Sequence, residues 1–379
     1  MKILHVETGM NLYGGALQVS YLLSGLHARG IDNLLLCPAG SAIADAARAV
    51  ATVHAVPMRG EADVSFAWRL WRLLVRERPD ILHIHSRRGA DLWGSLVTRW
   101  SGQPAMLTRR VDNPEPGWLA RWKYRPFRQV VTISEGIRSV LLKEGVPPDK
   151  VQCIHSAVDV TAWQQPADRD WFDREFGLPA DARPVGVIAQ LIERKGHRYL
   201  IEAAPAILAE FPKTYFLLFG KGPLGAELAA LCRERKIDRQ FVFAGFRADL
   251  PRIVPNLDLV VHPAEMEGLG VSLLQAAAAG VPIVAFRAGG VPEAVRSGIN
   301  GMLLESGDSR GLAREIKTLL DNPERRAMLG AGGKRLVQAE FSVDAMVAGN
   351  LAVYRAIIGK PSSPATPPPE ATFREEGGQ

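Results

Sequence analysis

Short apolar or β-branched runs alternate with helical patterns along almost the whole chain. The first half contains the runs KILHVE, NLLLCP, ILHIHS, AMLTRR, VVTIS and VQCIH, and the second half contains VGVIAQ, YFLLFG, QFVFAG, LVVHP, PIVAF and GMLLE. Strands that are each followed by a helix are typical of parallel sheets covered by helices. The segment TAWQQPADRDWFDREFGLPADARP is polar, proline-marked and without a strand, as expected of a domain connection. The pattern predicts an α/β fold of two Rossmann-like, doubly wound domains that face each other across a cleft.

Length and composition are those of an ordinary globular protein. The 379 residues suit two domains, and 47% of them are hydrophobic and 23% charged. The sequence has no apolar run long enough to span a membrane, and its first residues, MKILHVETGMNLYGG, lack a signal-peptide cleavage site. Three scattered cysteines argue against a disulfide framework or a thiolate metal cluster. We therefore expect a cytoplasmic protein.

The positive charge is concentrated in the first half. The net charge is +6, and the whole excess lies in residues 1–165. In VSFAWRLWRLLVRERP and GWLARWKYRPFRQ, tryptophans alternate with basic residues, a composition that suits a lipid headgroup region. One interpretation is peripheral binding to an anionic membrane, at the inner face of the cytoplasmic membrane. The other is a helix packed on a sheet with its arginines in water. Nucleic acid is not an expected partner, because no recognised nucleic-acid-binding motif accompanies the charge.

The segment HPAEMEGLGVSLLQAAAAGVP, residues 262–282, is the most informative part of the chain for function. Glu267 lies in a glycine-rich turn, where Gly268 and Gly270 allow backbone N–H groups to approach a ligand at the start of a helix. Gln275 falls about one turn into that helix and points back over the same end. The segment predicts a site for an anion with hydroxyl groups beside it. The alternative is a buried helix with Glu267 as a simple first-turn charge.

Two further glycine-rich turns follow strands. Gly14 and Gly15 precede an amphipathic helix, and residues 220–225 read G-x-G-x-x-G. We reject a nicotinamide-dinucleotide site at the second turn, because that pattern normally occupies the first strand–helix turn and the next strand ends in an acid. Here the next strand, QFVFAG, ends in glycine.

The segment 262–282 resembles the E-x7-E region of the retaining family 4 glycosyltransferases, which reads close to EGFG, four residues, then EA and G-x-P. Glu267 matches the first glutamate, and Gln275 stands where the second, which binds the nucleotide ribose, is expected. The resemblance implies the GT-B fold and a nucleotide-diphosphate sugar as substrate, with no cofactor. It implies that Glu267 contacts the donor sugar, that the amides of Gly268, Leu269 and Gly270 hold the diphosphate, and that Gln275 binds ribose.

Other segments extend the resemblance on the donor side. Lys195 matches the family lysine that neutralises the leaving diphosphate, and we predict Glu267 and Lys195 as the catalytic residues. Gln190 replaces the family arginine, a charge that we expect Arg194 to supply. The remaining predicted donor-binding residues are Gly14, Gly15, Gly220, Gly222, Gly245 and Phe246.

The first half is expected to provide the acceptor or phosphate side of the site. Arg110 stands where related sequences often carry a histidine, and Arg109 precedes it. Ser134 matches a family serine at a helix start, and we place His85 at the cleft edge and His83 in packing. His83 and His85 share one face of a strand, but no third ligand is evident, so we predict no metal.

The predicted reaction is transfer of a sugar from a nucleotide-diphosphate donor to a glycan or lipid-linked acceptor, with retention, in envelope polysaccharide or lipopolysaccharide assembly. The alternatives are a GT-B nucleotide-sugar epimerase and a catalytically weak glycosyltransferase-like binding protein. The predicted domains are residues 1–165 and 166–342. A final helix at 343–359 should cross back to the first domain, followed by a disordered tail at 360–379.

Overall fold

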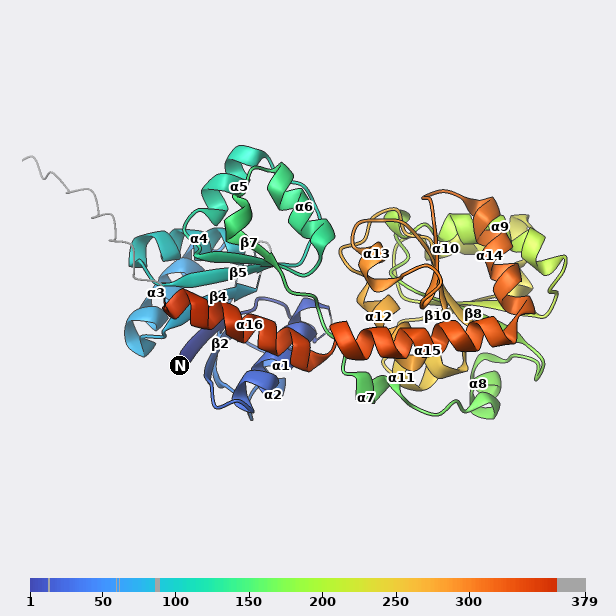
Figure 1. Cartoon of the computed structure of the whole chain (residues 1–379), viewed down its shortest axis with the longest axis horizontal. Coiled ribbons are helices and arrows are strands. Elements are labelled where there is room, and N and C mark those ends of the chain that lie inside the picture. The colour runs from blue at the N-terminus through green and yellow to red at the C-terminus, as the bar shows by residue number, and fades with distance from the viewer. Residues whose placement is uncertain (13, 59, 61, 86–88, 360–379) are drawn as a thin grey trace, which may run out of the picture.

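The computed structural model describes residues 1–12, 14–58, 60, 62–85 and 89–359. It contains two parallel sheets, each with helices on both faces (Figure 1). The prediction of two Rossmann-like α/β domains is confirmed. The tail predicted to be disordered, residues 360–379, lies outside the described residues.

The first sheet has seven strands in the order β3-β2-β1-β4-β5-β6-β7. They are β1 (Lys2–Val6), β2 (Asp32–Pro38), β3 (Thr52–Val56), β4 (Ile81–His85), β5 (Ala105–Arg109), β6 (Gln129–Thr132) and β7 (Val151–Cys153). The strand β3 was not predicted. It lies at the sheet edge and is nowhere fully buried, so its sequence, TVHAV, lacks the apolar run of the inner strands.

The second sheet has six strands in the order β10-β9-β8-β11-β12-β13. They are β8 (Arg183–Ile188), β9 (Thr214–Phe219), β10 (Phe241–Gly245), β11 (Leu259–His262), β12 (Ile283–Phe286) and β13 (Gly301–Leu304). All six lie in the predicted runs. In each sheet the strand order reverses at the first strand, between β1 and β4 and between β8 and β11. Ligands of doubly wound sheets bind beyond the carboxyl ends of the strands at such a reversal.

Helices cover both faces of each sheet. In the first domain they are α1 (Gly15–His27), α2 (Ala42–Ala46), α3 (Val64–Glu77), α4 (Ala90–Ser101), α5 (Gly117–Tyr124) and α6 (Glu135–Lys143). In the second they are α7 (Val160–Trp163), α8 (Arg169–Phe176), α9 (His197–Leu208), α10 (Gly225–Glu234), α11 (Leu250–Ile253), α12 (Val271–Ala279), α13 (Val291–Ala294), α14 (Ser309–Asp321) and α15 (Pro323–Glu340). None of the described helices is long and apolar enough to cross a membrane.

The last helix, α16 (Val343–Ile358), continues from α15 and lies on the first domain beside α1 (Figure 1). Its buried side chains, among them Val347 and Tyr354, join Ile3 and Leu22 in one apolar cluster. A Cβ on Gly25 of α1 would lie 2.5 Å from a methyl group of Val347, so glycine allows the close approach of the two helices. The limits predicted for the domains remain a prediction.

Candidate active site

The Glu267 carboxylate lies at the strand reversal of the second sheet, in the turn between β11 and α12. Its Oε2 pairs with Lys195 Nζ and accepts a hydrogen bond of 2.9 Å from His262 Nε2. Its Oε1 accepts a hydrogen bond of 3.1 Å from the amide of Gly268. Burial favours the neutral acid, but the hydrogen bonds and charges of His262 and Lys195 outweigh it and lower the pKa of Glu267 to about 2. The site therefore holds an anionic carboxylate in a fixed orientation.

Lys195 reaches Glu267 because the loops after β8 and β11 lie against each other. The amide of Glu265 donates to the carbonyl of Arg194 at 2.9 Å. Gly196, with φ 65°, faces the same turn, and a Cβ on it would lie 1.9 Å from the carbonyl oxygen of Pro263. Only glycine allows this approach of two backbones. Arg194 is exposed, and its guanidinium donates to the carbonyl of Met266 at 3.4 Å.

The loops after β9 and β10 complete this edge of the sheet. A Cβ on Gly220 would lie 2.0 Å from the carbonyl oxygen of Ala189, and one on Gly222 would lie 2.3 Å from that of Leu191. The amide of Gly220 donates to the carbonyl of Gly245 at 2.8 Å. The structure therefore brings together the predicted donor-binding residues of the second domain, including Gln190, which is exposed, and Phe246, whose side chain is 59% exposed.

Gln275 is half-buried in α12, one turn after Val271. The helix begins at Gly270, whose φ of 84° is left-handed, so the amides of Gly268 to Gly270 lie at the positive end of α12. Position 275 lies about one turn into α12, as expected, and the contact of its side chain with a ribose stays a prediction.

The first domain faces this turn closely. A Cβ on Gly268 would lie 3.6 Å from the carbonyl oxygen of Arg110, and one on Gly290 would lie 2.9 Å from Cβ of Ser134. Ser134 also caps α6, because its Oγ accepts a hydrogen bond of 3.1 Å from the amide of Ile137. The predicted helix cap is confirmed, and the cap lies at the contact between the two domains.

Arg110 lies at the strand reversal of the first sheet. A Cβ on Gly15, the first residue of α1 after Gly14, would lie 3.2 Å from Cδ of Arg110. Burial lowers the pKa of Arg110 to about 10, which leaves the guanidinium charged at neutral pH. The buried acid Glu7, at the end of β1, opposes that shift. Sequence reasoning missed Glu7, although an acid directly after the apolar run ILHV was a signal.

Arg109 is largely engaged within the first domain. It is 1% exposed and donates to Glu115 at 2.8 Å and to the hydroxyl of Tyr124 at 2.7 Å. Its other N–H groups donate to the carbonyls of Val111 and Asn113. Through these bonds Arg109 holds the loop before α5, and it also lines a pocket at the carboxyl edge of the first sheet, so its place on the acceptor or phosphate side stays a prediction.

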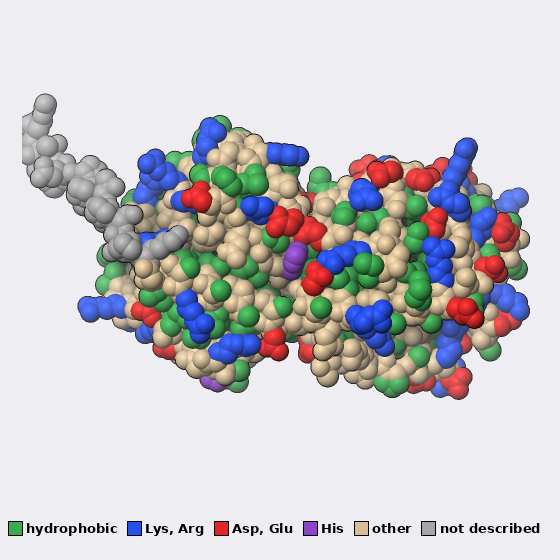
Figure 2. Space-filling view, in the orientation of Figure 1, with side chains coloured by type: hydrophobic (Ala, Val, Ile, Leu, Met, Phe, Trp, Pro, Cys, Tyr) green, Lys and Arg blue, Asp and Glu red, His purple; other side chains and the backbone are tan. Residues whose placement is uncertain are grey.

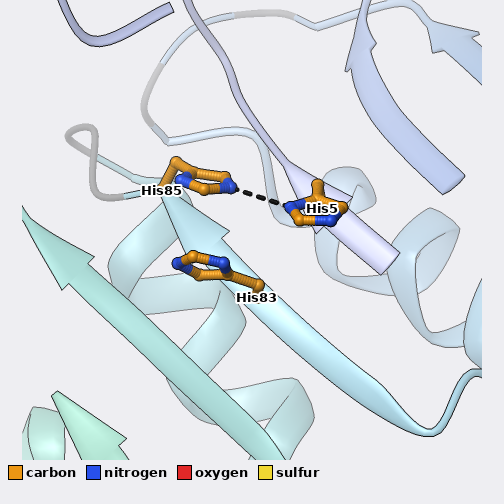
Figure 3. Close-up of side chains that lie close together, drawn as sticks. All are labelled: His5, His83 and His85. Carbon is orange, nitrogen blue, oxygen red and sulfur yellow. Dashed lines mark hydrogen bonds between the residues drawn. The ribbon is translucent and has the colours of Figure 1, made fainter. Parts of the chain in front are cut away.

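His85 requires a correction, since it is fully buried and belongs to a cluster with His83 and His5 (Figure 3). His5 is the third imidazole that the sequence did not reveal. It lies on β1 directly opposite His83 in the parallel register, and two strands far apart in sequence cannot be paired from their spacing. Burial lowers the pKa of His5 to about 3 and those of His83 and His85 well below the ordinary value. All three rings are therefore neutral at pH 7.

The hydrogen bonds of the cluster define its tautomers. A guanidinium can only donate, so Arg110 Nη2 donates to His85 Nδ1 at 3.4 Å. The other nitrogen of His85, Nε2, must then carry the proton and donate to His5 Nδ1 at 3.1 Å. Both nitrogens of His83 bond to hydroxyl groups, those of Tyr354 at 2.6 Å and Thr108 at 2.7 Å. These bonds and the positive charge of Arg110 oppose a divalent cation at the three rings, so the cluster fits a support for Arg110 better than a metal centre.

A pocket of about 970 Å³ opens beside Arg110 at the carboxyl edge of the first sheet. Glu7, Gly15, Asp91 and Asn113 are among its lining residues. The lining residues given for this pocket all belong to the first domain. This arrangement provides separate space for a second substrate.

Comparison with known proteins identifies the family. A model described as Glycosyltransferase Family 4 matches residues 13–162, and a model described as Glycosyl transferases group 1 matches residues 168–336. A 2-deoxystreptamine glucosyltransferase from Streptomyces kanamyceticus is 30% identical over 264 residues, which are 68% of each chain. The chain belongs to the family 4 glycosyltransferases.

This family 4 glycosyltransferase has other relatives of similar distance. The D-inositol 3-phosphate glycosyltransferase 1 of Catenulispora acidiphila is 30% identical over 311 residues, covering 74% of this chain and 72% of the relative. A glycosyltransferase structure from Rickettsia africae superposes with a TM-score of 0.84 at 18% identity, covering 95% and 99% of the two chains. The Anabaena HepE structure, solved in complex with UDP, superposes with a TM-score of 0.82 at 20% identity, covering 94% and 100%. The predicted GT-B fold and glycosyltransferase class are confirmed.

Proposed function

We propose that this glycosyltransferase moves a sugar from a nucleotide-diphosphate donor to a glycan or lipid-linked acceptor, with retention of anomeric configuration. The observation that carries the proposal is the Glu267 cluster at the reversal of the second sheet, which faces Arg110 across the domain contact. A fixed carboxylate suits the hydroxyl groups of a sugar, and the start of α12 suits a diphosphate.

Each side of the cleft contributes charge to the reaction. Glycosyl transfer breaks the bond between the anomeric carbon and the diphosphate, so negative charge grows on the leaving phosphate while the sugar becomes oxocarbenium-like. Lys195 and the amides of Gly268 to Gly270 stabilise that charge from the second domain, and Arg110 does so from the first. The acceptor oxygen bonds to the anomeric carbon, and its proton passes to an oxygen of the leaving diphosphate.

The acceptor enters from the pocket beside Arg110, which is the larger free volume on the first-domain side. A glycan or lipid-linked acceptor and a role in envelope polysaccharide or lipopolysaccharide assembly agree with the basic first half of the chain. The nucleotide-sugar donor agrees with the UDP complex of the structurally similar HepE.

A panel of UDP-, GDP-, ADP- and dTDP-sugars tests the proposal. Thermal shift identifies the donor, because a ligand that binds only the native state raises apparent stability. Nucleotide release and the anomer of the product, read by NMR, then establish turnover and retention. Nucleotide binding without turnover would overturn the transferase proposal in favour of a binding protein, and a free epimerised sugar would overturn it in favour of an epimerase. Lys195→Ala should abolish release, whereas Lys213→Ala, at an exposed surface ion pair, should not.

A further inference from the structure

Helices α3, α4 and α5 expose five tryptophan side chains, which we call the tryptophan face. Trp68 and Trp71 lie on α3, Trp100 on α4, and Trp118 and Trp122 on α5; Trp100 and Trp118 are each 68% exposed. Exposed tryptophans in this number are unusual, because the indole is among the most apolar groups that a protein can bury. Their exposure therefore suggests that this surface contacts something other than water.

The five tryptophans belong to one layer. Helix α3 packs against α4, and α4 packs against α5, and all three cover the same face of the first sheet. The guanidinium of Arg99 on α4 lies 5.7 Å from the ring of Trp122 on α5, which links the exposed sides of the two helices. On α3, Arg72 lies 4.6 Å from the ring of Trp68. The tryptophan face therefore lies in one helical layer, on the side of the sheet opposite α1 and α16.

The exposed charges of this layer are of one sign. Across the three helices, whose residues are all described, the exposed charged side chains are arginines: Arg72, Arg76, Arg99 and Arg121. The acids of these helices are paired with basic residues, Glu77 with Lys2 and with the neighbouring Arg76, and Asp91 with the buried Lys123. By contrast, Figure 2 shows basic and acidic side chains interspersed over the second domain. The tryptophan face is thus both apolar and cationic.

A groove of about 580 Å³ runs along the outer side of α3 next to the edge strand β3. Its lining includes the rings of Trp68 and Trp71, the methyl groups of Val56 and Val75, and the side chain of Arg72. Apolar walls beside a guanidinium match a lipid in which an acyl chain adjoins an anionic headgroup.

We propose that the tryptophan face docks on an anionic lipid bilayer. Indole rings favour the headgroup level of a bilayer, and arginines near the surface are attracted to anionic lipids. A second copy of the chain is a poorer occupant, because a two-fold contact through this face would bring arginines against arginines.

Docking through this face would bring the enzyme to a lipid-linked acceptor, so its role rests on the proposed function. Asp91 in the first turn of α4, and Asn113 and Glu115 just before α5, line the pocket beside Arg110. Two of the docking helices therefore begin at that pocket. An acceptor anchored in the same bilayer by a lipid would reach the pocket along the ends of these helices.

Sedimentation with vesicles tests docking without any need for activity. The full chain should sediment with phosphatidylcholine vesicles that contain phosphatidylglycerol, should remain soluble with phosphatidylcholine alone, and should bind more weakly at high salt. Arg72→Gln with Arg76→Gln should weaken binding about 25-fold, at about 5-fold for each arginine. Trp68→Ala with Trp71→Ala should weaken it and remove the blue shift of tryptophan emission on binding. All four side chains are at least partly exposed, so these variants should fold.

The matched control is Arg310→Gln with Met328→Ala, which changes an exposed arginine and an exposed apolar side chain of the second domain. This control should bind vesicles as the unaltered chain does. Failure of the chain to bind anionic vesicles at any salt, or unchanged binding by both double variants, would overturn docking. Binding to RNA or to an acidic protein in preference to vesicles would also overturn it. Turnover with a soluble acceptor separates the two proposals. If only the docking proposal is wrong, this turnover persists. If the transferase proposal is wrong, this turnover is absent.

Discussion

The carboxylate of Glu293 in the second domain accepts a hydrogen bond of 2.8 Å from Nε2 of His155, in the segment that leaves the first domain. The same carboxylate accepts hydrogen bonds from the amides of Glu135 at 2.7 Å and Gly136 at 3.0 Å, at the start of α6. Burial opposes the charged form, but these hydrogen bonds outweigh it and lower the pKa of Glu293. One side chain therefore caps a helix of the opposite domain and joins the two domains.

Glu293→Ala should loosen this contact. Removing a charged acceptor from two amides costs about 2 kcal/mol, so the amides of Glu135 and Gly136 should exchange about 30-fold faster. Hydrogen exchange read by mass spectrometry measures the change. Glu305→Ala, at an exposed ion pair with Arg287, is the control. Unchanged exchange at α6 would show that Glu293 does not hold the domains together in solution.

Gly136→Ala should lower the activity of the enzyme without lowering its stability. A Cβ at this position would lie 2.9 Å from backbone atoms of Gly289 and Gly290 in the second domain, while alanine favours the helix itself. We expect the midpoint of thermal unfolding to be unchanged or higher and kcat/KM to fall at least about tenfold, because the domains no longer meet closely. Ser139→Ala, at an exposed position of the same helix, should leave kcat/KM unchanged. A lower midpoint of thermal unfolding with unchanged kcat/KM would contradict a role of Gly136 in the contact between the domains.

Lys195→Met should weaken donor binding. The substitution removes the charge that pairs with Glu267 and that we assign to the diphosphate, at a cost of about 1.5 to 3 kcal/mol, or about 10- to 150-fold in Kd. Isothermal titration with the donor found by thermal shift measures the change. Equal Kd values for the variant and the unaltered chain would remove Lys195 from the donor site.

Gln275→Glu restores the charge that the family pattern has at this position. A charged acceptor makes hydrogen bonds about twice as strong as a neutral one, so we expect about tenfold tighter donor binding. Titration with the nucleoside diphosphate alone isolates the ribose contact from that of the sugar. Weaker or abolished binding would mean that the ribose pocket of this enzyme has been rebuilt around the amide.

The histidine cluster makes stability sensitive to acid. The pKa of His5 is lowered to about 3, so between pH 6.5 and that value the unfolded chain binds a proton that the folded chain does not. The stabilising effect of the neutral ring is complete above pH 6.5 and is lost as the pH falls. Each such histidine should lower the free energy of unfolding by about 1.4 kcal/mol per pH unit in this range.

Urea unfolding at a series of pH values tests the acid dependence. His5→Asn should reduce the slope by one proton, and His27→Gln, at an exposed position, should not change it. A free energy of unfolding that does not vary between pH 6.5 and pH 5 would show that the rings are protonated in the folded chain.

Much of the fold could be predicted because local patterns carry it. Twelve of the described strands are apolar runs between turn signals. The Glu267 turn could be predicted because glycines precede a helix there. The edge strand β3 could not be found this way, because a strand that is half in water needs no apolar run. A run of apolar residues indicates a buried strand, and an edge strand such as β3 is not fully buried.

The site was only partly predictable, for a different reason. Glu267 and Lys195 each lie in a recognisable motif, but the contact of Glu267 with His262 depends on where β11 ends. His5 meets His83 only through the pairing of β1 with β4, and Glu293 meets His155 only when the domains close. These relations arise from tertiary structure, and no spacing along the chain encodes them. The bonds by which Arg109 holds the loop before α5 are likewise a product of tertiary structure.

The position of α16 has a consequence for synthesis on the ribosome. The first domain needs Val347, Leu351 and Tyr354 to cover one face of its sheet, yet these residues are translated after the whole second domain. The first domain therefore leaves the ribosome with an uncovered apolar face and with His83 lacking its tyrosine partner, and it must wait while the whole second domain is made. A helix that is translated after the second domain therefore completes the folding of the first.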